Sequence, residues 1–356
     1  MVDTLLINET AKKLFKTLDT DKNFILIYTP PKVGSTTLVS SLRVSLGNSY
    51  NIIHIHDEIM LNVLTGIENV TINQIIHYLS ELGKNVFVID VYRTPVERKM
   101  SEFFEKISSY HFNNTEENVS NYNLDRIIKR FNKVYPHIEN SEHYFENYNI
   151  ESPPPFDFKK KYTIQQMKHN LKYIKLRLCD SSNWATILST VLKQDIVIIN
   201  DYHTKNKKIG DLYKRFKEEY RLPINYFEDL KTNKYLKYYY NDEEREKYLS
   251  EWNCKLGAPV VAYTPSEYRF YVNLYLENQH INDIQLEHYI DNGCFCKYCA
   301  VKRKEIFIKA KKGETHFEKI IHSKVILEYK KKVFTKIATQ NLKKKFVPNQ
   351  FSIKQL

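Results

Sequence analysis

Residues 24–37 read FILIYTPPKVGSTT, and this stretch decides the fold of the chain. Its first five residues are apolar, as in a buried strand, and apolar residues then recur at helical spacing from Leu38 to Leu46. The stretch therefore predicts a strand, a tight loop and a helix. Such a loop directs unpaired backbone N–H groups and the positive end of a helix dipole at one point, which makes it an anion site.

Further apolar or β-branched runs alternate with helical patterns along the first half of the chain. The predicted strands span residues 24–29, 51–56, 85–92, 173–178 and 195–200, and helical patterns include 71–82 and 125–134. Alternation of this kind predicts an α/β fold with a central parallel sheet, in which ligands bind at the carboxyl ends of the strands. Residues 139–161, which contain Pro153–Pro155, are predicted as a long surface loop, and residues 209–252 as a helical block.

A second motif follows the strand predicted at 85–92. Arg93 stands at the strand end, Thr94 is a good helix N-cap, and Glu97 completes a capping box three residues later. Ser101 falls one turn further along, so its hydroxyl can point back toward Arg93. A guanidinium beside a hydroxyl suits a phosphate group, because the forked donor grips two oxygens at once.

The two motifs together resemble the sulfotransferases that use 3′-phosphoadenosine 5′-phosphosulfate. PKVGSTT at residues 31–37 is similar to their 5′-phosphosulfate loop, and Arg93 with Ser101 is similar to their 3′-phosphate site. Over about residues 20–256 the chain is most similar to the capsular-polysaccharide-synthesis branch of sulfotransferase-like proteins. The Cys179-Asp180-Ser181 context departs from that branch, which more often has an acidic residue before the aspartate and a leucine after it.

The resemblance implies a three-layer, P-loop-NTPase-like sulfotransferase fold with a central parallel sheet. It also implies an enzyme that transfers a sulfuryl group from this cofactor to a hydroxyl or amine, with a glycan as the expected acceptor. It implies 3′-phosphoadenosine 5′-phosphate as the product, and the implied reaction requires no metal. Lys32 would neutralise the charge on the departing phosphate. The cofactor-binding residues that it implies are Pro31, Lys32, Val33, Gly34, Ser35, Thr36, Thr37, Arg93 and Ser101.

A catalytic base is expected at the end of the strand predicted at 51–56. His54 and His56 are two residues apart, so they point to the same face of a strand, and Asp57 and Glu58 follow directly. A histidine near carboxylates suits proton abstraction near neutral pH. His56 is the preferred base because it lies nearer the strand end, with His54, Asp57 and Glu58 as rivals. The alternative is that His54 packs on the sheet and Asp57 caps the next helix.

The charge of the chain is concentrated in its last hundred residues. Residues 257–356 hold 18 basic and 9 acidic residues, a net charge of +9, whereas the whole chain carries +12. This change predicts a catalytic domain at 1–256 and a basic, mostly helical C-terminal extension at 257–356. The extension is a candidate surface for a polyanion or nucleic acid.

The extension also contains a cysteine cluster. Cys294, Cys296 and Cys299 are candidate zinc ligands, with His288 or Cys254 as the fourth. The alternative is that they are buried free thiols. Five cysteines without a framework pattern favour a reducing compartment. No apolar run approaches the roughly 20 residues of a membrane span, and no signal peptide is recognisable, so the predicted location is the cytoplasm.

Two other functions remain open from the residues alone. A P-loop kinase would place lysine after glycine in GK[ST], whereas here Lys32 precedes Gly34, and Asp90 is the nearest candidate for its acidic strand-end residue. A non-catalytic nucleotide fold whose basic tail binds nucleic acid or another polyanion is the third interpretation. Retention of Lys32, Arg93 and Ser101 argues against that third interpretation.

Overall fold

The computed structural model describes residues 4–15, 21–112, 116–140, 142–168, 170–199, 209–265 and 267–268. The described residues form two compact units. The first comprises the described residues of 1–98, 140–203 and 226–254, and the second those of 99–139, 204–225 and 255–268.

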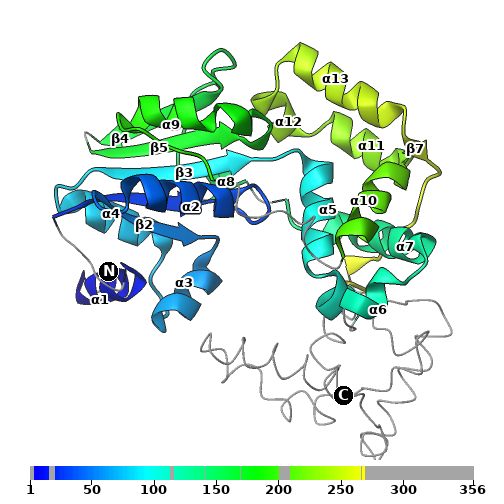
Figure 1. The fold of residues 1–356 in the computed structure, drawn as a ribbon, viewed down its shortest axis with the longest axis horizontal. Helices are drawn as coiled ribbons and strands as arrows, with labels where there is room; N and C mark the ends of the chain where they lie inside the picture. Colours follow the sequence, from blue (N-terminus) through cyan, green and yellow to red (C-terminus); the bar gives the residue numbers. More distant parts are fainter. Residues whose placement is uncertain are drawn as a thin grey trace, which may run out of the picture. The chain divides into compact units, whose positions relative to one another are not determined.

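The first unit is built on a five-stranded, mostly parallel sheet (Figure 1). Its strands are β1 (Asn23–Tyr28), β2 (Tyr50–Ile55), β3 (Val86–Tyr92), β4 (Tyr162–Lys168) and β5 (Leu171–Arg177). They lie in the order β2-β1-β3-β5-β4, and only β4 runs antiparallel, beside β5. The predicted α/β fold with a central parallel sheet is therefore confirmed at this level.

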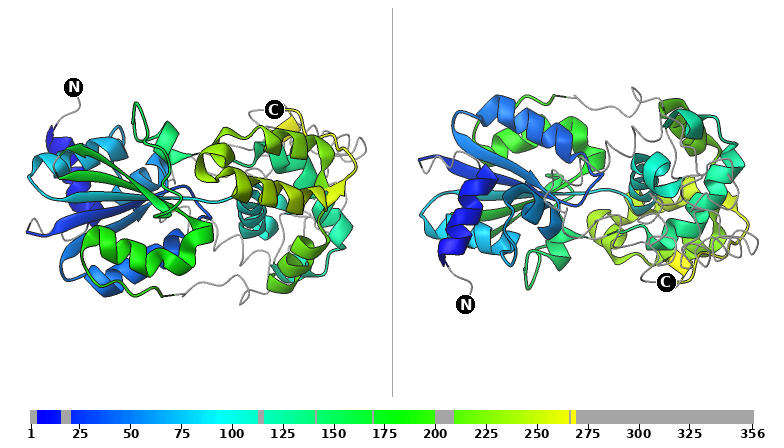
Figure 2. Two further views of the ribbon diagram at one scale, coloured as in Figure 1. Left: turned by 90° about the horizontal axis from the view of Figure 1, so that it is seen from above. Right: turned by 90° about the horizontal axis from the view of Figure 1, so that it is seen from below.

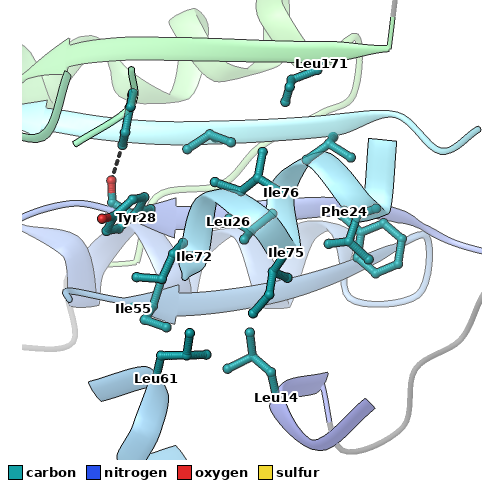
Figure 3. Close-up of a cluster of buried hydrophobic side chains, with 14 of the residues drawn as sticks. Leu14, Phe24, Leu26, Tyr28, Ile55, Leu61, Ile72, Ile75, Ile76 and Leu171 are labelled. Carbon is teal, nitrogen blue, oxygen red and sulfur yellow. Dashed lines mark hydrogen bonds between the residues drawn. The ribbon is translucent and has the colours of Figure 1, made fainter. Parts of the chain in front are cut away.

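Helices cover both faces of the sheet, which Figure 2 shows edge-on between two helical layers. α1 (Thr4–Phe15), α3 (Glu58–Thr65) and α4 (Ile72–Glu81) cover one face, while α2 (Ser35–Leu46) and α9 (Trp184–Leu192) cover the other. The sequence of β1 is almost continuously apolar because both faces of the strand are buried. Leu26 packs in the first core, which Figure 3 shows, and its neighbour Ile27 packs in the second.

The remaining elements of the first unit follow the sheet in sequence. They are α8 (His143–Glu146), a 3₁₀ turn (Leu178–Asn183), most of α11 (Ile224–Lys231), α12 (Lys234–Tyr239) and α13 (Asp242–Asn253). Capping boxes start two helices of this unit, with Thr71 and Gln74 at α4 and Asn241 and Glu244 at α13. These local signals explain why the helices predicted in these regions are present.

The second unit is helical with an aromatic core. It contains the end of α5 (Pro95–Glu105), a π-helix (Ile107–His111), α6 (Glu116–Ser120), α7 (Leu124–Val134), a 3₁₀ turn (Tyr135–His137), α10 (Gly210–Glu219) and the two-residue strands β6 (Leu222–Pro223) and β7 (Leu256–Gly257). Phe131 packs edge-on against Phe103 and Phe216, each with ring centroids 5.2 Å away. None of the described helices has the length and apolar character needed to cross a membrane.

Two expectations about local structure are wrong, and one strand was not predicted. Residues 195–199 do not form a strand; Val197 and Ile199 instead donate their backbone N–H groups to serine hydroxyls of α2. The place beside β5 is taken by β4, whose residues are largely exposed or half-buried and carry a weaker apolar signal. The predicted capping box at Glu97 is not formed in the described residues; its two carboxylate oxygens accept bonds from Tyr248 and Trp252 instead.

The predicted surface loop at 139–161 is also wrong over part of its length. Residues 142–148 include α8, and Glu142, His143, Tyr144 and Tyr148 are buried. The proline run excluded a helix only around residues 153–155. Aromatic and charged residues before it enter the first unit and take part in its polar core.

Candidate functional site

The candidate site lies where the order of the strands reverses. The chain runs from β1 to β2 on one side and then to β3 on the other side of β1, so the reversal lies between β1 and β3. In open α/β sheets ligands bind outside the carboxyl ends of the strands at such a point. The loop after β1 and Arg93 after β3 both occupy that edge.

The loop between β1 and α2 has the backbone of an anion site. Lys32 (φ 68°) and Gly34 (φ 90°) are both left-handed, with Val33 between them at negative φ. Alternation of this kind turns successive N–H groups to one side. Gly34 is the N-cap of α2, and within the described residues no side chain caps this helix. The first N–H groups of α2, from Ser35 onward, are therefore available to a ligand.

Gly34 is required for a second reason, which is the space behind the loop. A Cβ at this position would lie 2.9 Å from Leu178 Cδ1 and 3.0 Å from the Trp184 ring. Trp184 is fixed in turn, because its indole nitrogen donates to the Arg177 carbonyl at 3.2 Å. The loop thus rests on the segment that follows β5.

Arg93 contacts this loop directly. Its Nη1 donates to the Lys32 carbonyl at 2.7 Å, which leaves the other guanidinium N–H groups without a partner in the described part of the chain. Both cationic residues predicted for the cofactor site, Lys32 and Arg93, are therefore brought together. Ser101 is half-buried on α5 in the second unit, and its predicted pairing with Arg93 stays a prediction.

His54 lies on β2 and His56 directly follows the end of that strand, and their rings lie next to each other, as the spacing predicts. Their ring centroids are 4.4 Å apart. His56 Nδ1 lies 2.6 Å from the Thr29 carbonyl. Because a carbonyl only accepts, Nδ1 carries a proton, and in the neutral ring Nε2 is then the nitrogen with the lone pair. His54 is a weaker base, since burial and the neighbouring His56 and Arg43 lower its pKa to about 3.

The two acidic rivals of His56 are engaged with backbone. Asp57 Oδ1 accepts from Met60 N at 2.7 Å and caps α3, as the alternative interpretation held. Glu58 accepts from Ile72 N with both oxygens, at 3.2 and 3.0 Å. His56 Nε2 has no hydrogen-bond partner in the described residues, so among the four candidate bases His56 stays the preferred one.

A buried charge cluster beneath this edge was missed by the sequence analysis. Lys175 Nζ lies 2.6 Å from Asp90 Oδ2 and also pairs with Glu142, and all three side chains are nearly fully buried. Asp90 further accepts from the Thr29 hydroxyl at 2.6 Å. Because Asp90 is enclosed and paired, it is not placed to hold a magnesium ion as the acid of a P-loop kinase would be.

Glu142 has a raised pKa in this cluster. Burial raises its pKa to about 7, against the opposing effect of Lys175. One ammonium cannot neutralise two carboxylates, and Asp90 receives three donors besides Lys175, from Thr29 and from the backbone N–H groups of Val91 and Tyr144. The proton that relieves the excess negative charge therefore goes to Glu142.

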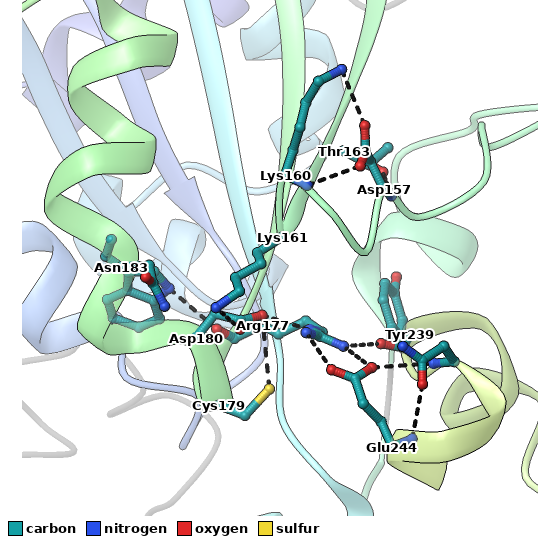
Figure 4. Close-up of polar contacts among 12 residues, drawn as sticks. Asp157, Lys160, Lys161, Thr163, Arg177, Cys179, Asp180, Asn183, Tyr239 and Glu244 are labelled. Carbon is teal, nitrogen blue, oxygen red and sulfur yellow. Dashed lines mark hydrogen bonds and ion pairs between the residues drawn. The ribbon is translucent and has the colours of Figure 1, made fainter.

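A second buried cation, Arg177, ties β5 to the helical segment of the same unit (Figure 4). Its guanidinium donates to Asp180 at 2.6 Å and to Glu244 at 2.7 and 3.0 Å. It also donates to the Tyr239 carbonyl at 2.8 Å. These bonds hold the turn that carries Leu178 and Trp184, and hence the support behind Gly34.

The predicted zinc ligands Cys294, Cys296, Cys299 and His288 lie outside the described residues. Cys254 is described and is an exposed free thiol. Of the predicted extension at 257–356 only residues 257–265 and 267–268 are described, so the domain boundary and the polyanion contact stay predictions. Comparison with protein-family models found no match, and searches of curated proteins and of solved structures found none either.

Proposed function

We propose that this protein is a sulfotransferase that moves a sulfuryl group from 3′-phosphoadenosine 5′-phosphosulfate to a hydroxyl or amine, with carbohydrate as the expected acceptor. The observation that carries the proposal is the bond from Arg93 to the Lys32 carbonyl. It joins the residues of two separate motifs at one uncapped helix N-terminus, at the reversal point of the sheet.

The donor set at this edge fits a doubly phosphorylated nucleotide. Backbone N–H groups of α2, the Lys32 ammonium and the Arg93 guanidinium all donate to anionic oxygens. Of the carboxylates named above, Asp90 is paired with the Lys175 ammonium, which offsets its charge, and Asp57 and Glu58 accept bonds from backbone N–H groups. Arg93 and Lys32 would hold the phosphates of the cofactor.

The residues suit an in-line transfer. When bound, the cofactor supplies an activated sulfuryl group on a phosphate leaving group. Lys32 and the N–H groups of residues 34–37 would offset the charge that develops on the departing phosphate oxygen, and preorganised donors of this kind are each worth about 3 kcal/mol. His56 Nε2 would take the proton of the acceptor hydroxyl as its oxygen bonds to sulfur.

Ligand-induced stabilisation tests the proposal without knowledge of the acceptor. We expect 3′-phosphoadenosine 5′-phosphate at 100 times its dissociation constant to add about 2.7 kcal/mol to the free energy of unfolding. Adenosine 5′-monophosphate should add less, because it lacks the 3′-phosphate. The measurement is a thermal shift series over ligand concentration, with ATP in parallel.

Arg93→Ala should abolish most of this stabilisation, because it removes the bidentate cation. Arg245→Ala is the matched control, since Arg245 pairs with Asp242 on α13 and lies outside the site. Stabilisation by ATP alone, or equal stabilisation of Arg93→Ala and Arg245→Ala, would contradict the proposed function.

A further inference from the structure

Segment 142–148 connects the candidate base to the buried charges of the sheet. His143 Nε2 lies 2.6 Å from the His56 carbonyl. Tyr148 donates its hydroxyl to the Tyr28 carbonyl, and Tyr144 N donates to Asp90 Oδ2 at 3.2 Å. The segment therefore contacts the ends of β1, β2 and β3, although it lies far from them in sequence.

One half of this connection runs through Thr29. Its carbonyl accepts from His56 Nδ1 at 2.6 Å, and its hydroxyl donates to Asp90 Oδ1 at 2.6 Å. Val91 N also donates to the same hydroxyl at 3.1 Å. The carbonyl that selects the His56 tautomer is thus fixed to β3 from behind.

The other half runs through Lys175 and returns to His56. Lys175 pairs with Asp90 and with Glu142, and Glu142 precedes His143 in the chain. Tyr239 adds a bond to Glu142 Oε1 at 3.0 Å. Together with the peptide link from Glu142 to His143, these bonds form a closed loop that starts and ends at His56, and both hydrogen bonds of His56 found in the described residues belong to it.

The proton positions in this closed loop follow from the acceptors. His143 Nε2 faces a carbonyl, so it carries the proton, and Nδ1 is left buried without a partner among the described residues. Burial lowers the pKa of His143, so the imidazole of His143 is neutral at neutral pH. His143 thus acts on His56 as a hydrogen-bond donor and not as a second charge.

We propose that His143 is a positioning residue for His56: with the Thr29 carbonyl, it holds the His56 ring in the orientation and tautomer that expose Nε2 as the proton acceptor. The assignment of Nε2 as acceptor in sulfuryl transfer rests on the proposed function. The positioning itself does not, because it concerns bonds within the protein.

The test is the imidazole ¹⁵N spectrum of ligand-free protein labelled at histidine. We expect His56 to show the Nδ1–H tautomer in the wild type. His143→Phe keeps a ring of similar shape but loses the donor, so the Nδ1–H population of His56 should fall. His143→Gln retains a donor and should restore it, whereas His77→Gln on α4 should leave the His56 signals unchanged.

Binding of 3′-phosphoadenosine 5′-phosphate is measured on the same samples and should be retained in His143→Phe. An Nε2–H tautomer of His56 in the wild type, or unchanged His56 signals in a folded His143→Phe, would overturn the positioning role. If His143→Phe does not fold, His143→Leu, which also lacks the donor, is compared with His143→Gln in its place, and unchanged His56 signals in His143→Leu would equally overturn the role. Failure of the nucleotide to bind any variant contradicts the proposed function and leaves the tautomer result standing.

Discussion

At the scale of the residue, Gly34 meets two demands at once, a left-handed backbone and close packing. Gly34→Ala adds a methyl group 2.9 Å from Leu178 Cδ1 at φ 90°. Gly83→Ala is the matched control, because Gly83 has φ 76° but nothing within 4 Å of its Cβ position. We expect Gly83→Ala to lower the free energy of unfolding by about 1–2 kcal/mol and Gly34→Ala by roughly 2–5 kcal/mol.

Urea denaturation of the two variants gives this comparison directly, provided that the slope with denaturant stays the same. Equal losses would mean that the loop moves away from Trp184 without cost. Lys32 has a similar left-handed backbone, at φ 68°, without being glycine. A strained residue of this type costs about 1–3 kcal/mol and tends to persist at ligand-binding sites.

At the scale of the element, Asp57 acts as the N-cap of α3. Its carboxylate accepts from Met60 N at the start of α3. Asp57→Ala should lower the free energy of unfolding by about 1 kcal/mol, while Asp57→Ser keeps a capping oxygen and should lose much less. Thermal denaturation of both variants checks this. A loss as large in Asp57→Ser as in Asp57→Ala would contradict capping as its role.

The elements that the sequence predicted correctly are those with a strong local signal. β1 and β3 are buried on both faces and are almost continuously apolar, and α4 begins at a capping box. β5 is also buried, and its apolar residues Tyr173, Ile174 and Leu176 gave its signal although basic residues lie between them. β4 was missed because an edge strand is half exposed and carries polar residues such as Gln165 and Gln166. Residues 195–199 were assigned wrongly because β-branched composition does not identify a partner strand.

The candidate site divides in the same way. The loop after β1, Arg93 and the His54–His56 pair depend on neighbouring residues, and the sequence predicted their place at strand ends. The Asp90–Lys175 pair joins residues 85 apart in sequence, and Glu142 lies in a segment without helical period. No local pattern predicts such pairs, because they depend on which strands become neighbours.

At the scale of the whole first unit, the buried cluster makes stability depend on pH. Burial raises the pKa of Glu142 from 4.5 to about 7, so the native state holds one more proton than the unfolded state between these values. The stabilising contribution is complete below pH 4.5 and is lost as pH rises through about 7. One proton sets a slope of at most about 1.4 kcal/mol per pH unit.

Glu142→Gln should remove this part of the slope, because the amide stays neutral at every pH. Glu151→Gln, at an exposed position of the same unit, is the control and should keep the wild-type slope. Free energies of unfolding from denaturant titrations at pH 5, 6, 7 and 8 give the comparison. Parallel curves for the wild type and Glu142→Gln would show that Glu142 does not hold the extra proton.

The packing of Trp184 behind Gly34 gives the protein a built-in optical signal. The chain has only two tryptophans, and the other, Trp252, donates its indole N–H to Glu97 at 3.2 Å. Replacing Trp252 with phenylalanine would leave Trp184 as the sole source of indole fluorescence. Emission from one chromophore would then report how the loop responds to nucleotides, with no label attached and no knowledge of the acceptor.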